Sequence, residues 1–179
     1  MAVLHRAEIS PSKLEVATAW LDDQPWGGTG AVELIGGYRF DDPDGEVGVE
    51  ALIARRGDLI AQVPLTYRGA PLDGAESHLI TTMEHSALGR RWIYDATHDP
   101  VAQACFARAL ADEQQQAAVE LHHLDGSVEQ IDPAVKVHLA GEPSRGSVVL
   151  SGDLRSPVDG AARLVATWDG GEAVVAAAG

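Results

Sequence analysis

The sequence is poor in cysteine. Its single thiol, Cys105, cannot form an internal disulfide, so the fold must be held together by other interactions. Cys105 lies in a stretch with helical periodicity, where a small buried side chain is far more common than a reactive thiol. We therefore interpret Cys105 as a core residue and expect a cytoplasmic protein.

Basic residues are also scarce. The chain has 13 Lys and Arg residues against 27 Asp and Glu residues, which gives a formal net charge of −14. Nucleic acids and anionic membranes both attract surfaces rich in Lys and Arg, so the composition disfavours both as partners. No apolar run is long enough to span a bilayer, and the first residues, MAVLHRAEIS, lack the apolar core of a secretory signal.

The patterns that are present predict helices and antiparallel strands within one globular unit. A helix is expected over residues 10–22, with Ser10 as its N-cap and Pro11 in its first turn. Strands are predicted over residues 32–40, 46–55 and 59–67, because apolar residues alternate there. The turns between them are short, so neighbouring strands must pair antiparallel. One turn, Arg56-Gly57-Asp58, spells an integrin-type tripeptide, which we interpret as a hairpin turn.

The second half of the chain predicts another helix and more strands. The helix is expected to begin at Pro100, capped by Asp99, and to run to about Gln116. Its apolar stripe would comprise Val101, Ala104, Cys105, Ala109 and Leu110. Six short strands follow, over residues 118–123, 128–131, 135–139, 147–151, 163–168 and 173–177. They suggest a meander that extends the first sheet or packs against it, so the predicted fold class is α+β.

Candidate site residues gather between Val63 and Pro100. They are Tyr67, Arg68, Glu84, His85, Arg90, Arg91, Trp92, Tyr94, Asp95 and His98. We interpret Glu84, Arg90, Arg91 and Asp95 as a network of charge-assisted hydrogen bonds that fixes this segment, since buried polar groups require partners.

Neither metal binding nor nucleophilic catalysis is indicated by the spacing of these residues. His122 and His123 are adjacent, so on a strand they point to opposite faces, and no histidine or cysteine spacing typical of a metal site occurs. Ser86 lacks the flanking glycines of a nucleophile elbow. We therefore name no catalytic, cofactor-binding or metal-binding residue and expect no cofactor.

Three stretches resemble a known module. They are Val3-Leu4-His5-Arg6-Ala7-Glu8 with the following Ser10-Pro11, the segment VPLTYRGAPL from Val63, and the segment EHSALGRRWIYD from Glu84. These residues resemble the N-terminal cap domain of actinobacterial maltokinases and related sugar kinases, and above all short stand-alone proteins that carry this domain. The resemblance covers about residues 1–118. It implies a curved antiparallel sheet packed by a helix, similar to a cystatin fold. The C-terminal strands are not part of that cap, and from their pattern we expect residues 119–179 to form a β-rich extension of the same globular unit.

The resemblance does not extend to the kinase reaction. Kinase lobes of this kind need a catalytic Asp shortly before an Asn, and a second Asp that binds metal. The chain contains no asparagine, and His123-Leu124-Asp125 is only a weak match to the motif. No catalytic residue of the kinases can be placed in this sequence.

The sequence therefore favours a non-catalytic, cap-like binding or regulatory module. Its expected partner is a sugar kinase or a glucan enzyme of glycogen, maltose or trehalose metabolism. The alternative is an enzyme or a small-ligand (sugar) binding protein with a pocket around residues 67–99. A homo-oligomer formed through exposed sheet edges is a third possibility.

Overall fold

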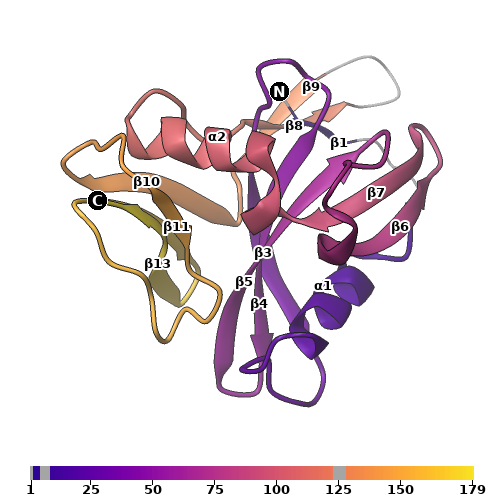
Figure 1. The fold of residues 1–179 in the computed structure, drawn as a ribbon, viewed down its shortest axis with the longest axis horizontal. Helices are drawn as coiled ribbons and strands as arrows, with labels where there is room; N and C mark the ends of the chain where they lie inside the picture. The colour runs from indigo at the N-terminus through magenta and orange to yellow at the C-terminus, as the bar shows by residue number, and fades with distance from the viewer. Residues whose placement is uncertain (1, 5–8, 123–127) are drawn as a thin grey trace.

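The structure is a computed structural model that describes residues 2–4, 9–122 and 128–179 (Figure 1). A curved six-stranded antiparallel sheet forms its centre, in the order β2-β6-β7-β5-β4-β3. The bounds of these strands are β2 (Ile9–Ser10), β3 (Glu33–Phe40), β4 (Gly48–Arg56), β5 (Leu59–Arg68), β6 (Leu79–His85) and β7 (Gly89–Asp95). The predicted α+β class and the antiparallel pairing of the first strands are confirmed.

Helix α1 (Lys13–Asp22) begins later than predicted. Its N-cap is Ser12, whose hydroxyl accepts a hydrogen bond from the amide of Glu15, while the Glu15 carboxylate accepts one from the amide of Ser12. This reciprocal capping box fixes the start of the helix. Ser10 instead lies in β2, so Pro11 precedes the helix and is not in its first turn.

Strand β4 also begins later than predicted, at Gly48. The carboxylate of Asp42 accepts hydrogen bonds from the amides of Glu46 and Val47. Both residues are therefore held in the turn that follows β3, and the strand starts after them.

The hairpin interpretation of Arg56-Gly57-Asp58 is confirmed, because Arg56 pairs with Leu59 across a two-residue turn. Gly57 has a φ of 58°, a conformation that glycine adopts without strain. Arg56 is only 4% exposed; it donates to the carbonyl of Gly27 and pairs with Asp22. Its guanidinium is thus bound within the fold and is not displayed at the surface.

Helix α2 (Pro100–Leu110) has Asp99 as its N-cap, as predicted, but ends at Leu110 and not near Gln116. Ala111 caps its C-terminus, and Asp112 turns the chain out of the helix with a φ of 61°. Cys105 is buried, as predicted, whereas Ala104 is exposed. The buried side chains of α2 are those of Ala102, Cys105, Phe106, Ala109 and Leu110.

The last strands form a four-stranded antiparallel sheet, which we call the C-terminal sheet. It comprises β10 (Val135–Gly141), β11 (Val148–Leu150), β12 (Ala162–Trp168) and β13 (Gly171–Ala178), in the order β10-β12-β13-β11. The order differs from the predicted meander, because β11 pairs with β13 and not with β10.

A third, small sheet pairs the start of the chain with the segment that follows α2. In it β8 (Val119–His122) pairs in parallel with β1 (Ala2–Leu4) and antiparallel with β9 (Val128–Ile131). The motif residues 5–8 and His123-Leu124-Asp125 lie outside the described residues.

The central sheet is covered on both faces. α1 packs on one face through Val16, Trp20 and Leu21, and the other face packs against α2 and the C-terminal sheet (Figure 1). Gln62 of β5 is fully buried, and its amide donates to the carbonyls of Ser151 and Val175, which ties β5 to the C-terminal strands. A domain division at residue 118 and the likeness to cystatin stay predictions. Within the described ranges, neither helix is long and apolar enough to cross a membrane.

Candidate functional site

The candidate residues lie on both faces of the central sheet. Cross-strand partners point to the same side of a sheet, so the pairing of Tyr67 with Ile93, and of Arg91 with Met83, directs Tyr67 and Arg91 towards α1. The α1 face thus carries Tyr67, Arg91 and Asp95, and the opposite face carries Arg68, Glu84, Arg90, Trp92 and Tyr94. His85 ends β6, and His98 ends the short 3-10 helix η2 (Ala96–His98). The set is divided between two surfaces.

On the α1 face, Glu50 is the centre of a group of polar contacts. Its carboxylate lies 2.7 Å from Nζ of Lys13 and accepts a hydrogen bond of 2.8 Å from the hydroxyl of Tyr67. Burial favours a raised pKa for Glu50, but the charges of Lys13 and Arg39 and the two hydrogen bonds lower that pKa below its usual value. Burial and the neighbouring Glu50 raise the pKa of Tyr67 well above its usual value. Lys13 is the first residue of α1, so these contacts fix the helix to β4 and β5.

On the opposite face, Asp99 holds the start of α2. Its carboxylate accepts two hydrogen bonds from Arg68, of 2.7 and 2.8 Å, one of 2.8 Å from the Thr66 hydroxyl and one of 2.9 Å from the Val101 amide. Burial favours a raised pKa for Asp99, but these donors and the charge of Arg68 lower the pKa below its usual value. One fully buried carboxylate therefore joins β5 to the N-terminus of α2.

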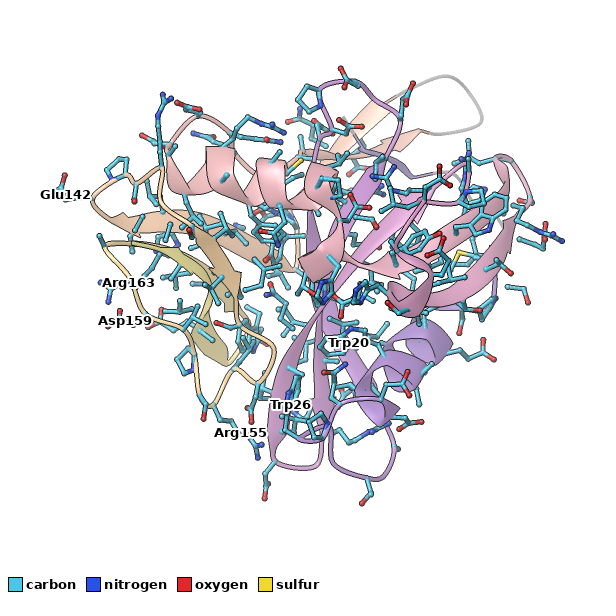
Figure 2. The ribbon with its side chains drawn as sticks, in the orientation of Figure 1. Trp20, Trp26, Glu142, Arg155, Asp159 and Arg163 are labelled. Carbon is cyan, nitrogen blue, oxygen red and sulfur yellow. The ribbon has the colours of Figure 1, made fainter. Side chains whose placement is uncertain are left out.

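Two further candidate residues brace loops. The indole Nε1 of Trp20 donates to the carboxylate of Asp95 at 2.7 Å, and the Thr97 amide donates to the same carboxylate at 2.8 Å. The hydroxyl of Tyr94 accepts from the amide of Leu72 at 2.9 Å. The side chain of Trp20 extends from α1 towards the sheet, and its ring lies beside that of Trp26 (Figure 2). Asp95 and Tyr94 therefore connect the sheet to α1 and to the loop before β6.

The hairpin of β6 and β7 carries the exposed candidates. Nε of Arg90 lies 2.7 Å from the Glu84 carboxylate, and their side chains are 61% and 62% exposed. His85 Nδ1 accepts hydrogen bonds from the amides of Ala87 and Leu88 in the turn, where Leu88 is 55% exposed.

The four charged residues expected to form one network make separate contacts. Arg90 pairs with Glu84, and Asp95 bonds to Trp20 and Thr97. Nε of Arg91 is buried without a hydrogen-bond partner among the described residues.

His98 stacks on His78, with ring centroids 3.6 Å apart and ring planes 11° from parallel. The lone pairs of the ring nitrogens lie in the ring planes, so stacked rings do not direct them at one ion. Within residues 2–4, 9–122 and 128–179, no group of three or more His, Cys, Asp or Glu side chains is arranged to hold a metal.

Residues 20–99 match the family model of the maltokinase N-terminal cap domain. The chain carries a maltokinase cap-like domain. Comparisons with curated proteins and with solved structures give no match.

The matched segment of the cap-like domain begins and ends at buried polar contacts. It starts at Trp20, which bonds to Asp95, and it ends at Asp99, which bonds to Thr66 and Arg68. Strands β3 to β7 lie between these two residues. The first and last residues of the matched segment are thus each bonded to another part of it, Trp20 to the end of β7 and Asp99 to β5.

Sequence reasoning missed Glu50, Lys13 and Arg39 on the α1 face of the central sheet, and foresaw Asp99 only as a helix cap. A signal for Glu50 existed, because it interrupts the apolar run from Val49 to Ile53. The carboxylates of Glu50 and Asp99 have lowered pKa values and are bonded to donors. Such groups hold elements in place and are poor proton-transfer groups near neutral pH.

Proposed function

We propose that the cap-like domain docks on a kinase-type catalytic domain and regulates it without supplying catalytic residues. The observation that carries this proposal is the match of residues 20–99 to the maltokinase N-terminal cap. The partner would be a sugar kinase, or a glucan enzyme of the same metabolism, in the same polypeptide or in another.

The exposed hairpin of β6 and β7 is the proposed docking surface. It lies at the right margin of the molecule in Figure 1, above α1. It presents the apolar Leu88, the ion pair of Glu84 and Arg90, and the partly exposed Trp92. Trp and Arg are the residue types that contribute most at protein interfaces. The buried Tyr94 and the partly buried Tyr67, Arg68 and Asp95 would support this surface from beneath.

The test is a titration of the chain against a maltokinase whose own cap domain has been deleted. We expect a dissociation constant in the micromolar range and a change in the kcat/KM of the kinase for its sugar. Leu88→Asp and Trp92→Ala should each weaken binding about tenfold, because truncating one important interface residue costs more than about 1 kcal/mol.

The matched control is Val149→Asp, an equally exposed apolar residue on the distant C-terminal sheet. It should leave binding unchanged. Absence of binding at 100-fold the expected dissociation constant, or equal loss in the Leu88 and Val149 variants, would count against docking through the hairpin.

A further inference from the structure

One basic residue of the described chain has no partner. Arg6 lies outside the described residues, and every other Lys and Arg except Arg91 either hydrogen-bonds to an acceptor or lies close to a carboxylate. No nitrogen of the Arg91 guanidinium forms a hydrogen bond or an ion pair with a described residue. The chain has 27 Asp and Glu residues against 13 Lys and Arg residues, so a shortage of carboxylates is not the reason.

The surroundings of Arg91 hold its guanidinium in place. Arg91 pairs with the buried Met83 across β6 and β7, so its side chain lies on the α1 face. Nη1 lies so close to Gly69 that a Cβ at that position would be 2.7 Å from it. Of the unbonded nitrogens of this side chain only Nε is buried, and the residue as a whole is partly exposed. The stem is therefore covered, and the two terminal nitrogens are presented at the surface.

Arg56 shows the contrasting case of a guanidinium that the chain buries for its own fold. Its Nε is also buried without a hydrogen bond. Its terminal nitrogens, however, are bonded: Nη1 donates to the carbonyls of Gly27 and Gly28, and Nη2 lies 2.8 Å from the carboxylate of Asp22. Buried charges are normally paired in this way. The terminal nitrogens of Arg91 are therefore available to an acceptor from outside the chain.

We propose that Arg91 binds a carboxylate of the protein on which the cap-like domain docks, supplied by an Asp or Glu side chain of that partner. The inference rests on the proposed function. Arg91 lies on β7 between Arg90 and Trp92 of the docking surface, with its side chain on the other side of the hairpin. A partner that encloses the hairpin from both sides covers Arg91, and a covered guanidinium needs an anion. Its two terminal nitrogens match the two oxygens of a carboxylate.

The charge of the chain favours a carboxylate carried by a protein over a free anion such as phosphate. Arg91 offers one positive charge in a chain with a formal net charge of −14, and its basic neighbour on β7, Arg90, is already paired with Glu84. A free dianion would be repelled by the chain as a whole and held by a single residue. A carboxylate on a docked partner is positioned by the rest of the interface, so a single guanidinium can pair with it.

The test repeats the kinase titration with variants of Arg91. Arg91→Met keeps an apolar stem beside Met83 and removes the guanidinium, and it should raise the dissociation constant about tenfold or more. Arg91→Lys keeps the charge but loses the paired nitrogens, so its dissociation constant should lie between those of the wild type and Arg91→Met. Arg55→Met is the matched control. It changes the net charge equally, and Arg55 is 49% exposed at the far end of β4, so this variant should bind like the wild type.

Two further measurements identify the acceptor and check the free chain. Single Asp or Glu residues of the kinase are replaced by Asn or Gln. One replacement should weaken binding of the wild-type chain and leave binding of Arg91→Met unchanged, because both changes remove the same contact. Urea unfolding of Arg91→Met alone should not occur at a lower urea concentration than that of the wild type, since no bond within the fold is lost.

The outcomes separate this inference from docking itself. If the wild-type chain does not bind the kinase, docking fails and the carboxylate site fails with it. If the wild type binds and Arg91→Met binds equally well, or if no kinase carboxylate couples to Arg91, only the carboxylate site is overturned. A clear fall in the urea midpoint of Arg91→Met overturns it too, because Arg91 would then be bonded within the fold. So does inorganic phosphate at millimolar concentration, if it saturates a shift of the Arg91 Nε–Hε NMR signal at constant ionic strength.

Discussion

Three ion pairs around the central sheet have the same length and very different surroundings. Arg68 and Asp99, Lys13 and Glu50, and Arg90 and Glu84 each have a shortest nitrogen–oxygen distance of 2.7 Å. The side chains are 17% and 0% exposed in the first pair, 37% and 7% in the second, and 61% and 62% in the third. The distance therefore does not distinguish how much each pair stabilises the fold. Burial and the number of hydrogen-bond donors do.

The comparison also separates their roles. The first pair joins β5 to α2, and the second joins α1 to β4, so both connect elements far apart in sequence. The third lies across one hairpin, whose strands are adjacent in sequence. Removing a buried pair should therefore loosen a helix from the sheet, and removing the exposed pair should leave the fold intact.

The largest effect is expected from Asp99→Ala. It leaves Arg68, Thr66 and the Val101 amide without their acceptor and removes the cap of α2. Breaking a buried charged pair costs about 3–5 kcal/mol, and we expect a loss near the lower end because Arg68 is 17% exposed. Urea unfolding at pH 7 measures the loss.

Asp99→Asn is the matched control, because asparagine is a good N-cap and still accepts hydrogen bonds. It should recover at least about 1 kcal/mol of the loss. If both variants unfold at the same urea concentration as the wild type, the buried pair does not stabilise the fold, and burial does not rank the three pairs.

A smaller effect is expected from Glu50→Gln, and it should depend on pH. The pKa values of Glu50 and Asp99 are both lowered in the folded state. Their stabilisation is therefore complete above the unfolded pKa values, about 4.3 for Glu and 3.9 for Asp, and is lost as the pH falls through the folded values. Glu50→Gln should cost about 1–2 kcal/mol at pH 7, since Lys13 is partly exposed.

The measurement is urea unfolding of wild type and variant at pH 7, 5, 4 and 3. The difference between the two should shrink as the pH falls below about 4, because the wild type then also loses the Glu50 charge. A difference that stays constant over this range would mean that the Glu50 carboxylate is not stabilised by Lys13 and Arg39.

The sequence was a good guide wherever the signal was local. Asp99-Pro100 marked the start of α2, and the Gly57 turn marked the hairpin of β4 and β5, because caps and tight turns depend on neighbouring residues. Ser10 was mistaken for the cap of α1 because Ser12 is an equally good candidate two residues later, and only the pairing of β2 with β6 decides between them.

Contacts between distant segments could not be predicted. Glu50 sits in an alternating strand, and nothing nearby in the sequence shows that Lys13 and Tyr67 converge on it. The pairing of β11 with β13 likewise depends on the connection between β11 and β12, which bonds to β5 through Gly152 and Leu154. The ten candidate residues were identified from one segment, but strand alternation divided them between two faces.

The smallest effect is expected from Arg90→Gln, and it tests the comparison most strictly. Its pair with Glu84 has the same 2.7 Å distance as the two buried pairs, so an account based on distance predicts an equal loss. Exposed pairs of this kind contribute about 0.5 kcal/mol or less, because water and salt screen the charges and two flexible side chains must be ordered. Urea unfolding of Arg90→Gln should therefore coincide with that of the wild type within about 0.5 kcal/mol, at low salt and at 1 M salt alike. A loss of 2 kcal/mol would show that the hairpin pair supports the fold as Asp99 and Glu50 do, and the hairpin could then no longer be treated as a surface free for docking.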